Sequence, residues 1–369
     1  MIPEVFFTNL RSHSGLNLLD KLEKLLKRTG IEKIDFKDKF VALKVHFGEW
    51  GNMAYIRPNY VGRVAKVIKE LGGMPYLTDS NTLYKGSRSD AVHHLQCAEM
   101  NGFNSITTGC NVIIADGVKG TDYCEIPLPD AHYCKHPKIG TAIADCDVFI
   151  ALSHFKGHEQ SGFGGALKNI GMGSASIGGK LELHSTAQPQ IESSLCIGCK
   201  MCERNCQQGA IHINESRKAV IDYERCVGCG QCIAVCRNGA AQVTSWTSSC
   251  ELNYKIDEYT KAVLKDKPCF FVNFIMNVSP ECDCWNFNDA AIVPDLGIMA
   301  SFDPVALDQA SVDMVCKAPT LPHSIVEEKT AHKEEDVFTH IHPDTNWKEG
   351  LRYAEEIGLG SRKYQLIII

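Results

Sequence analysis

Two runs of four cysteines in the middle of this chain constrain its fold more than any other feature. The first run reads CIGCKMCERNC and the second reads CVGCGQCIAVC. Both follow the spacing Cys-x2-Cys-x2-Cys-x3-Cys, and eight thiols repeated in a short segment indicate metal ligands or disulfide bonds. The residues are Cys196, Cys199, Cys202 and Cys206 in the first run, and Cys226, Cys229, Cys232 and Cys236 in the second.

The rest of the sequence favours metal ligands over disulfide bonds. Cysteine accounts for 18 of the 369 residues, but the first residues have neither the basic segment nor the apolar run of a signal peptide. The longest apolar stretches are shorter than the roughly 20 residues that cross a membrane. We therefore expect a protein of the reducing cytoplasm, where thiols stay available for metals. The formal charge of -6 argues against nucleic acid or an anionic membrane as a partner.

The spacing within each run is typical of a cubane iron–sulfur cluster. Such a cluster needs four thiolate ligands, three from a tight loop and a fourth from elsewhere in the fold. Zinc sites are the alternative, but they use two cysteine pairs that lie far apart in the sequence. We predict two [4Fe-4S] clusters. Gly198 and Gly228 within the runs, and the small residues GAI and GAA after them, let backbone amides approach the sulfur atoms.

The two runs resemble the bacterial two-cluster ferredoxin module over roughly 60 residues. In that module, the fourth cysteine of each run binds the cluster of the other run. The resemblance implies one cluster on Cys196, Cys199, Cys202 and Cys236, and a second on Cys226, Cys229, Cys232 and Cys206. The module usually has proline after the fourth cysteine, whereas this chain has Gln207 and Arg237. We expect ligation to be kept and the turn to be less rigid.

The remainder of the chain alternates predicted strands and helices. An apolar helical face ends at Gly30, and a second helix starts at Pro58, as capping preferences predict. Continuous apolar runs such as FVALKVHF and DVFIALSHF are typical of buried strands in a parallel sheet. We predict an α/β fold, a mostly parallel sheet covered by helices, with an inserted ferredoxin-like α+β domain. Residues 1–186 and 247–369 then form the α/β domain, and residues 187–246 form the insertion.

A glycine-rich polar segment, SHFKGHEQSGFGGALKNIGMGSASIGGKLELH, follows one predicted strand. Open α/β sheets bind ligands at the carboxyl ends of their strands, and exposed amides with lysines suit a phosphate or carboxylate. The candidate catalytic residues in this segment are His154, Lys156 and Lys168, and the candidate cofactor-binding residues are His158, Gly164, Gly165 and Asn169. A loop that only packs against the insertion is the alternative.

Two further groups follow predicted strands. Cys282 and Cys284 form a CDC motif whose thiols are close enough to clamp a metal or to form a redox pair; two buried free thiols are the alternative. His46 and Asp79 end two strands that we predict to be adjacent. Both are candidate catalytic residues, although a histidine at the end of a strand is often structural.

Five motifs together resemble the domain-of-unknown-function 362 family, in members that carry an inserted ferredoxin. They are KVHFGEWGN, LTDSNTLYKG, SHFKGHEQSGFGGALKNIGMG, CDCWNF and GIMASFDPVALDQAS. The resemblance covers nearly the whole chain. It implies a cytoplasmic iron–sulfur protein of an anaerobe whose reaction is unassigned.

These features predict an iron–sulfur redox protein and a candidate ferredoxin-linked oxidoreductase. Low-potential electrons from a redox partner protein would pass through the two clusters to an unidentified substrate or cofactor in the α/β crevice, which suits an anionic small molecule. The alternative hypothesis is an accessory protein that binds or delivers a metal or cluster through Cys282, Cys284 and nearby histidines. An electron carrier with an enlarged docking surface is a third.

Overall fold

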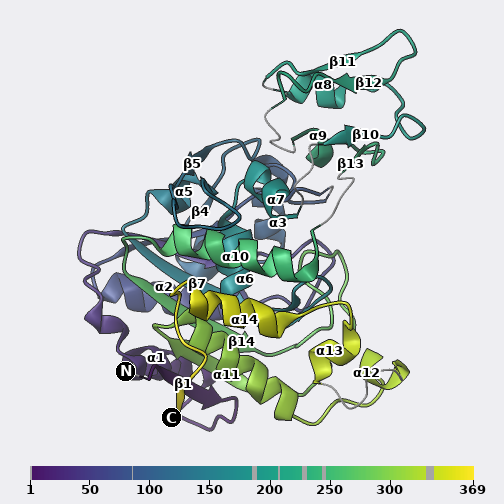
Figure 1. Ribbon diagram of the computed structural model, residues 1–369. Helices are drawn as coiled ribbons and strands as arrows, with labels where there is room; N and C mark the ends of the chain where they lie inside the picture. The colour runs from purple at the N-terminus through teal and green to yellow at the C-terminus, as the bar shows by residue number, and fades with distance from the viewer. Residues whose placement is uncertain are drawn as a thin grey trace.

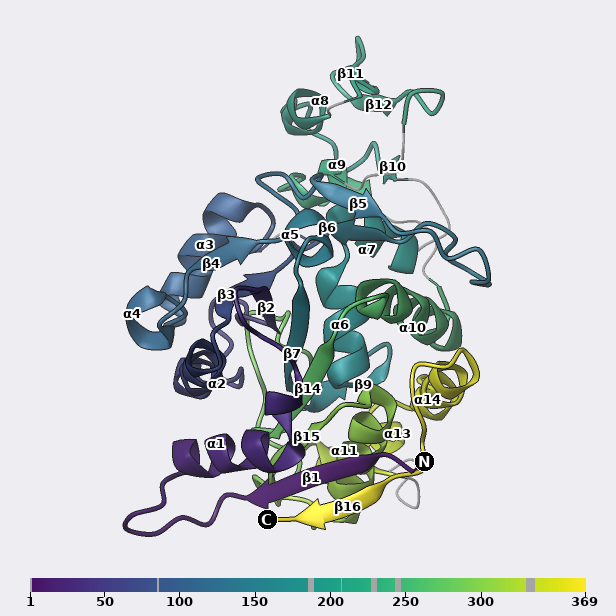
Figure 2. The same cartoon turned by 90° about the vertical axis from the view of Figure 1, so that its left-hand side faces the viewer.

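A single large sheet forms the centre of the protein (Figure 1, Figure 2). The computed structural model describes residues 2–84, 86–184, 189–206, 208–226, 231–242, 247–329 and 336–369. The sheet has eight strands in the order β16-β1-β15-β14-β7-β2-β3-β4. Only the pairs that β15 makes with β1 and β14 are antiparallel, which confirms the predicted mostly parallel α/β sheet. The strands are β1 (Glu4–Asn9), β2 (Phe40–Val45), β3 (Met74–Asp79), β4 (Val112–Ile114), β7 (Val148–His154), β14 (Cys269–Ile275), β15 (Gly297–Ser301) and β16 (Gln365–Ile368).

Helices cover both faces of this sheet (Figure 2). In β2, Val41 and Leu43 pack on the face of α1 and α2, whereas Ala42 packs on the face of α6, α10 and α11, as the alternation of a strand requires. The helices are α1 (Leu18–Thr29), the 3-10 helix η1 (Ile31–Lys33), α2 (Pro58–Glu70), α3 (Ala91–Met100), α4 (Ser105–Thr108), α5 (Thr141–Ala144), α6 (Ala166–Ser174), α7 (Ile177–His184), α8 (Met201–Asn205), α9 (Gln231–Ala234), α10 (Ser249–Leu264), α11 (Pro304–Lys317), α12 (Ile325–Glu328), α13 (Val337–Ile341) and α14 (Trp347–Glu356).

The helix ends follow from local sequence. The side chain of Asn17 accepts backbone hydrogen bonds at the start of α1, and Gly30 ends that helix in the left-handed region with φ 89°. Asp303 accepts the N–H of Ala306 at 2.8 Å, and Pro304 occupies the first position of α11. Side-chain caps and a proline at the first position each satisfy or remove an unpaired amide.

A small lobe projects from the α/β domain at the top of Figure 1. Its strands are β10 (Gln190–Ile191), β11 (Ile211–Ile213), β12 (Ala219–Ile221) and β13 (Ala241–Gln242), and its own small core contains several cysteines of the two runs. The chain enters and leaves the lobe at one place, because the N–H of Thr247 donates to the carbonyl of His184 at 2.9 Å. The predicted boundary residues 187 and 246 lie outside the described residues.

Candidate functional site

Several predicted site residues lie where the parallel strands of the sheet end. Strands β14, β7, β2 and β3 are parallel neighbours, so the segments that follow them meet at one edge of the sheet. Cys282 and Cys284 follow β14, His46 follows β2, and Asp79 ends β3. The glycine-rich segment follows β7.

That segment begins with a hairpin that packs on the cysteine loop. The hairpin consists of β8 (Lys156–His158) and β9 (Gly162–Gly164); the other small pair of strands is β5 (Tyr123–Glu125) with β6 (Lys138–Gly140). The N–H of Gly157 donates to the carbonyl of Ser279 at 2.8 Å. A Cβ atom at Gly157 would lie 2.1 Å from the carbonyl oxygen of Pro280. Glycine is therefore required for the hairpin to lie this close to the loop.

The sulfur of Cys282 is the centre of the site. Cys282 is fully buried, and the Nζ atom of Lys168 donates to its Sγ atom at 3.1 Å. His158 and Cys284 also hydrogen-bond to this sulfur. The Nδ1 atom of His158 accepts two backbone N–H groups at 3.1 Å, so the neutral ring carries its proton on Nε2 and can donate it to the sulfur.

Cys282 and Cys284 differ in their protonation. The hydrogen bond from Cys284, together with Lys168 and His158, holds the pKa of Cys282 well below its usual value despite burial. The hydrogen bond to Cys282 and burial raise the pKa of Cys284 well above its usual value. Burial favours the neutral amine of Lys168, but the two cysteines outweigh it and raise the pKa of Lys168. These shifts favour a thiolate on Cys282 beside the ammonium of Lys168, with the thiol on Cys284, and the thiolate is the reactive form of cysteine.

The charge of Cys282 reaches three rings, those of His46, Tyr84 and His184. Burial and the charge of Arg88 hold the pKa of His46 well below its usual value, and its Nδ1 atom accepts a backbone N–H at 3.0 Å. Tyr84 and His184 contact each other edge to face, with ring centroids 5.7 Å apart. Both lie close enough to Cys282 to sense its charge. Burial lowers the pKa of His184 to about 3, so its ring is neutral.

The side chains of His154 and Lys156 contact the loop that carries Cys282 and Cys284. The Nδ1 atom of His154 lies 2.8 Å from the Oδ1 atom of Asp283, and its Nε2 atom lies 2.8 Å from the carbonyl of Met276. Both ring nitrogens of His154 are therefore engaged with groups of the loop. Lys156 donates to the carbonyl of His154 at 3.0 Å and lies 3.5 Å from Asp283. Since both side chains are engaged in holding the loop, the geometry gives them a positioning role, and their predicted catalytic role remains a prediction.

Asn169 and Asp79 contact a buried lysine instead of Cys282. The Nζ atom of Lys44 is 2.8 Å from the Oδ1 atom of Asn169 and 2.9 Å from the Oδ1 atom of Asp79. The amide of Asn169 also donates to the carbonyl of Leu152 at 3.1 Å. These two predicted site residues therefore belong to a second polar cluster at the same edge of the sheet.

The two predicted glycines position α6, the helix that carries Lys168. A Cβ atom at Gly164 would meet the Lys156 side chain at 3.4 Å, an ordinary contact. At Gly165 it would lie 2.3 Å from the Oδ1 atom of Asp308. The carboxylate of Asp308 accepts the first two backbone N–H groups of α6 at 2.7 and 2.9 Å. Gly165 therefore allows Asp308 to cap the helix from below.

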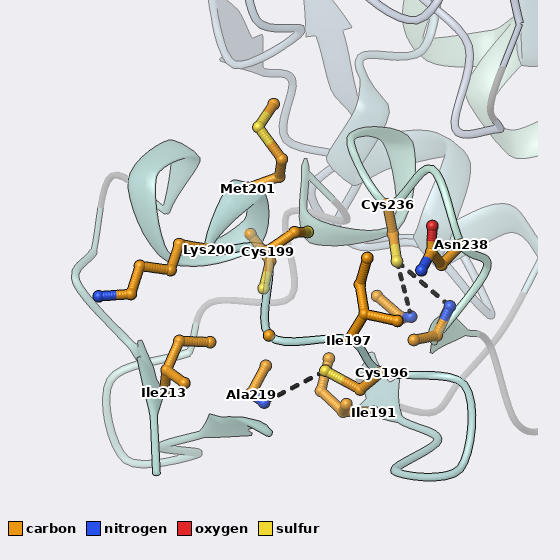
Figure 3. Close-up of a pocket in the computed structure, with 14 residues that line it drawn as sticks. Ile191, Cys196, Ile197, Cys199, Lys200, Met201, Ile213, Ala219, Cys236 and Asn238 are labelled. Carbon is orange, nitrogen blue, oxygen red and sulfur yellow. Dashed lines mark hydrogen bonds between the residues drawn. The ribbon is translucent and has the colours of Figure 1, made fainter. Parts of the chain in front are cut away.

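Cysteines from both runs line one pocket in the lobe (Figure 3). They are Cys196, Cys199, Cys202 and Cys236. Backbone amides donate to the sulfur atoms: that of Ala219 to Cys196 at 3.3 Å, and those of Ala240 and Ala241 to Cys236 at 3.2 and 3.3 Å. The small residues after the second run thus approach sulfur, as the sequence predicts. Three cysteines of the first run and the last cysteine of the second share this pocket.

The other cysteines of the runs lie in the same small core. Cys206, Cys226 and Cys232 pack there, and the N–H of Ala210 donates to the sulfur of Cys206 at 3.2 Å. Cys229, Gly228 and Gln207 lie outside the described residues. Within the described ranges, no three His, Cys, Asp or Glu side chains are arranged to hold a single metal ion.

The lobe contacts the α/β domain close to the site. Ile233, on α9 next to Cys232, packs against Leu83, Ile177 and Leu181. Leu83 precedes Tyr84, and the other two residues lie on α7, which ends at His184. The contact therefore joins the second cysteine run to the two elements that carry the rings near Cys282.

Comparisons with known proteins identify a family and two similar structures. The family model described as domain of unknown function (DUF362) matches residues 41–313, and no curated protein matches the chain. The lactate racemase apoprotein from Thermoanaerobacterium thermosaccharolyticum is similar at 12% identity and a TM-score of 0.38, over 73% of this chain and 50% of that one. A protein from Thermotoga maritima is similar at 10% identity and a TM-score of 0.42, over 80% and 57%. The chain thus spans half of the first structure and little more than half of the second.

No helix in the part of the chain that the structure describes is long and apolar enough to cross a membrane.

Proposed function

This chain belongs to the DUF362 family, whose name states no reaction, and we propose that it is an iron–sulfur redox protein. Its lobe is a two-cluster ferredoxin module, and electrons pass through two [4Fe-4S] clusters to an acceptor at the Cys282 site. The protein works in the reducing cytoplasm of an anaerobe.

The pocket of four cysteines carries the proposal. A cubane needs four thiolates, and each of them binds a different iron atom. Ligands for a cubane are therefore spaced more widely than ligands for one metal ion. Amides that donate to cysteine sulfur also suit a cluster, because they stabilise its negative charge. When bound, each cluster supplies one electron at a time.

The lobe has an exposed surface at which a redox partner can deliver electrons, and a surface that packs on the α/β domain. Cys199 is exposed, and Ile197 beside it is 62% exposed, so a redox partner protein can dock close to the first cluster. The lobe also packs on the α/β domain, through Ile233. With clusters bound, the pocket of Figure 3 would face the redox partner, and the second run, next to Ile233, would lie on the side of the lobe that packs on the α/β domain.

At the receiving site, this chain's own residues hold a reactive sulfur and its protons. Lys168 fixes the Cys282 thiolate at 3.1 Å, and Cys284 and His158 each present a hydrogen bond to it. The acceptor is a substrate or cofactor that binds beside this pair. An anionic ligand competes with Cys282 for Lys168, so the lysine can release the thiolate when the ligand binds.

Iron counts in paired variants test the crossed ligand sets. In Cys199→Ser/Cys236→Ser, both substitutions fall on the first cluster, so about four irons remain. In the matched control Cys199→Ser/Cys206→Ser, each cluster loses a ligand and almost no iron remains. The opposite pattern, with iron kept in the control and lost in the first variant, means that each run binds its own cluster.

The second candidate function is an accessory protein that binds or delivers a metal or cluster. The observation that favours it is that His158 and Cys284 both contact the sulfur of Cys282, although these three described side chains are not arranged around one metal ion. Metal analysis separates the two functions. If the wild type holds metal beyond the cluster iron, and this extra metal is lost in Cys282→Ser/Cys284→Ser, the result supports delivery. If the wild type holds no such extra metal, the result supports electron transfer.

A further inference from the structure

A second polar cluster lies beside the Cys282 site, at the ends of β2, β3 and β4. Its charged members come from four separate segments and are all buried: Lys44, Asp79, Arg88, Asp116 and Lys180. Buried charges at this density are rare unless they are paired or functional.

Asp79 is the centre of the pairing in this cluster. Its carboxylate is 2.9 Å from Lys44, 3.6 Å from Arg88 and 3.8 Å from the ring of His94. Arg88 also lies 2.9 Å from the carboxylate of Glu49. This half of the cluster is therefore close to balanced in charge.

Asp116 and Lys180 form the other half. The Oδ1 atom of Asp116 accepts two N–H groups of Asn81 at 2.9 Å. Lys180 donates to the carbonyl of Ala175 at 2.6 Å and interacts with Asp116 and Asp79 through its charge. Neither Asp116 nor Lys180 takes part in the contacts around Cys282.

Several polar atoms of this cluster lack a hydrogen-bond partner among the described residues. They are Asp79 Oδ2, Ser80 Oγ, Arg88 Nη2, His94 Nε2 and Asp116 Oδ2. Buried polar atoms are nearly always bonded to protein or to ordered water. The carboxylate oxygen Oδ2 of Asp116 is among these atoms and is therefore available to a proton.

Helix α7 connects this cluster to the lobe and to the Cys282 site. Ile177 and Leu181 on α7 pack against Ile233 of the lobe. Lys180 and His184 are four residues apart on α7 and therefore share one face. Besides burial, the positive charge of Lys180 helps to lower the pKa of His184. One helix thus touches the iron–sulfur lobe, the polar cluster and the rings near Cys282.

We propose that Asp116 and Lys180 form a proton-uptake site that is coupled to reduction of the lobe. The step balances, since one electron from the external donor protein enters a cluster and one proton from water binds the Asp116–Lys180 pair. The proton neutralises the added negative charge, which is poorly screened in a buried setting. It can then move along the face of α7 toward His184. This inference rests on the proposed function.

The protonation behaviour of the pair supports this role. Burial raises the pKa of the Asp116 carboxyl, which Lys180 opposes. Burial lowers the pKa of the Lys180 amine, which Asp116 and Asp79 oppose while Lys44 and Arg88 add to it. Both shifts bring the pKa values of Asp116 and Lys180 closer to neutral pH, where a proton can be gained or lost.

Redox titration of the anaerobic holoprotein at several values between about pH 6 and pH 9 tests the coupling. The potential of the wild-type cluster nearest α7 should fall as pH rises, because reduction takes up a proton. Asp116→Asn and Lys180→Met should each remove most of this dependence. Asp257→Asn is the matched control, because Asp257 on α10 is also a buried carboxyl with a raised pKa. In this variant the pH dependence of the potential should remain.

The outcomes separate this inference from the proposed function. Reducible clusters whose potentials are independent of pH in the wild type overturn the coupling and leave the redox function intact. A pH dependence of the potential that survives in both Asp116→Asn and Lys180→Met also overturns the coupling and leaves the redox function intact. A protein without reducible clusters overturns both. Asp116→Asn keeps the shape of the side chain, and if it does not fold, Lys180→Met decides alone.

Discussion

Replacing the buried pair of Lys44 and Asp79 should show that this part of the site depends on paired charge. The two side chains lie 2.9 Å apart and are 0% and 3% exposed. Lys44→Met leaves Asp79 with the backbone N–H of Ser80 at 3.0 Å and its longer contacts to Arg88 and His94. Asp79→Asn leaves Lys44 with the amide oxygen of Asn169. Each single variant therefore leaves one buried charge without its main partner.

The expected cost of each single variant is about 3–5 kcal/mol of unfolding free energy. The double variant should cost about 2–3 kcal/mol less than the sum of the two, because it leaves neither charge behind. An unfolding entropy of roughly 2.1 cal/mol/K per residue, over the roughly 300 residues of the α/β domain, gives about 0.6 kcal/mol per kelvin. Each single variant should thus lower Tm by roughly 5–8 °C.

Thermal unfolding followed by circular dichroism measures these shifts. The control is the exposed pair of Lys66 and Glu70, which lie 3.5 Å apart and are 60% and 51% exposed. Lys66→Met should change the free energy of unfolding by less than about 1 kcal/mol. If the losses for Lys44→Met and Asp79→Asn simply add in the double variant, the pair does not act as a unit and the reasoning is wrong.

Two further predictions concern the glycines and the lobe. Gly165→Ala should lower Tm by several degrees, because its Cβ atom would lie 2.3 Å from Asp308 and overpacking costs about 1–3 kcal/mol. The control Gly164→Ala should be tolerated. Equal Tm values for the two variants would contradict the prediction. Replacing residues 187–246 by a short Gly/Ser linker should leave a cooperatively folded α/β domain, because the chain ends at the lobe are already hydrogen-bonded. Loss of a cooperative unfolding transition would show that the lobe is integral to the core.

Much of the fold could be predicted from local patterns. Capping residues such as Asn17, Gly30 and Asp303 act within one turn of their helices, so their effect is visible in the sequence. Long apolar runs gave the central strands for the same reason. The order of the strands depends on contacts between distant segments. The antiparallel position of β15 between β1 and β14 therefore carries no local signal.

The candidate site was predictable only in part. The cysteine spacing is local, and so are the glycines that let backbone amides reach sulfur. The roles of His154 and Asn169 depend on partners such as Asp283 and Lys44, which lie more than 100 residues away. Tyr84 lies in the motif LTDSNTLYKG but was not predicted as a site residue, because its place in the site depends on contact with His184, 100 residues away. His184 has one weak signal, its position four residues after Lys180.

The metal content of the anaerobically purified chain tests the central claim most directly. Iron and acid-labile sulfide should each be present at about eight atoms per chain. Reductive titration followed by electron paramagnetic resonance should consume about two electrons per chain and produce the signals of two reduced cubanes. Zinc in place of iron, or iron without sulfide, would contradict the claim that the lobe holds two clusters and delivers electrons to the Cys282 site.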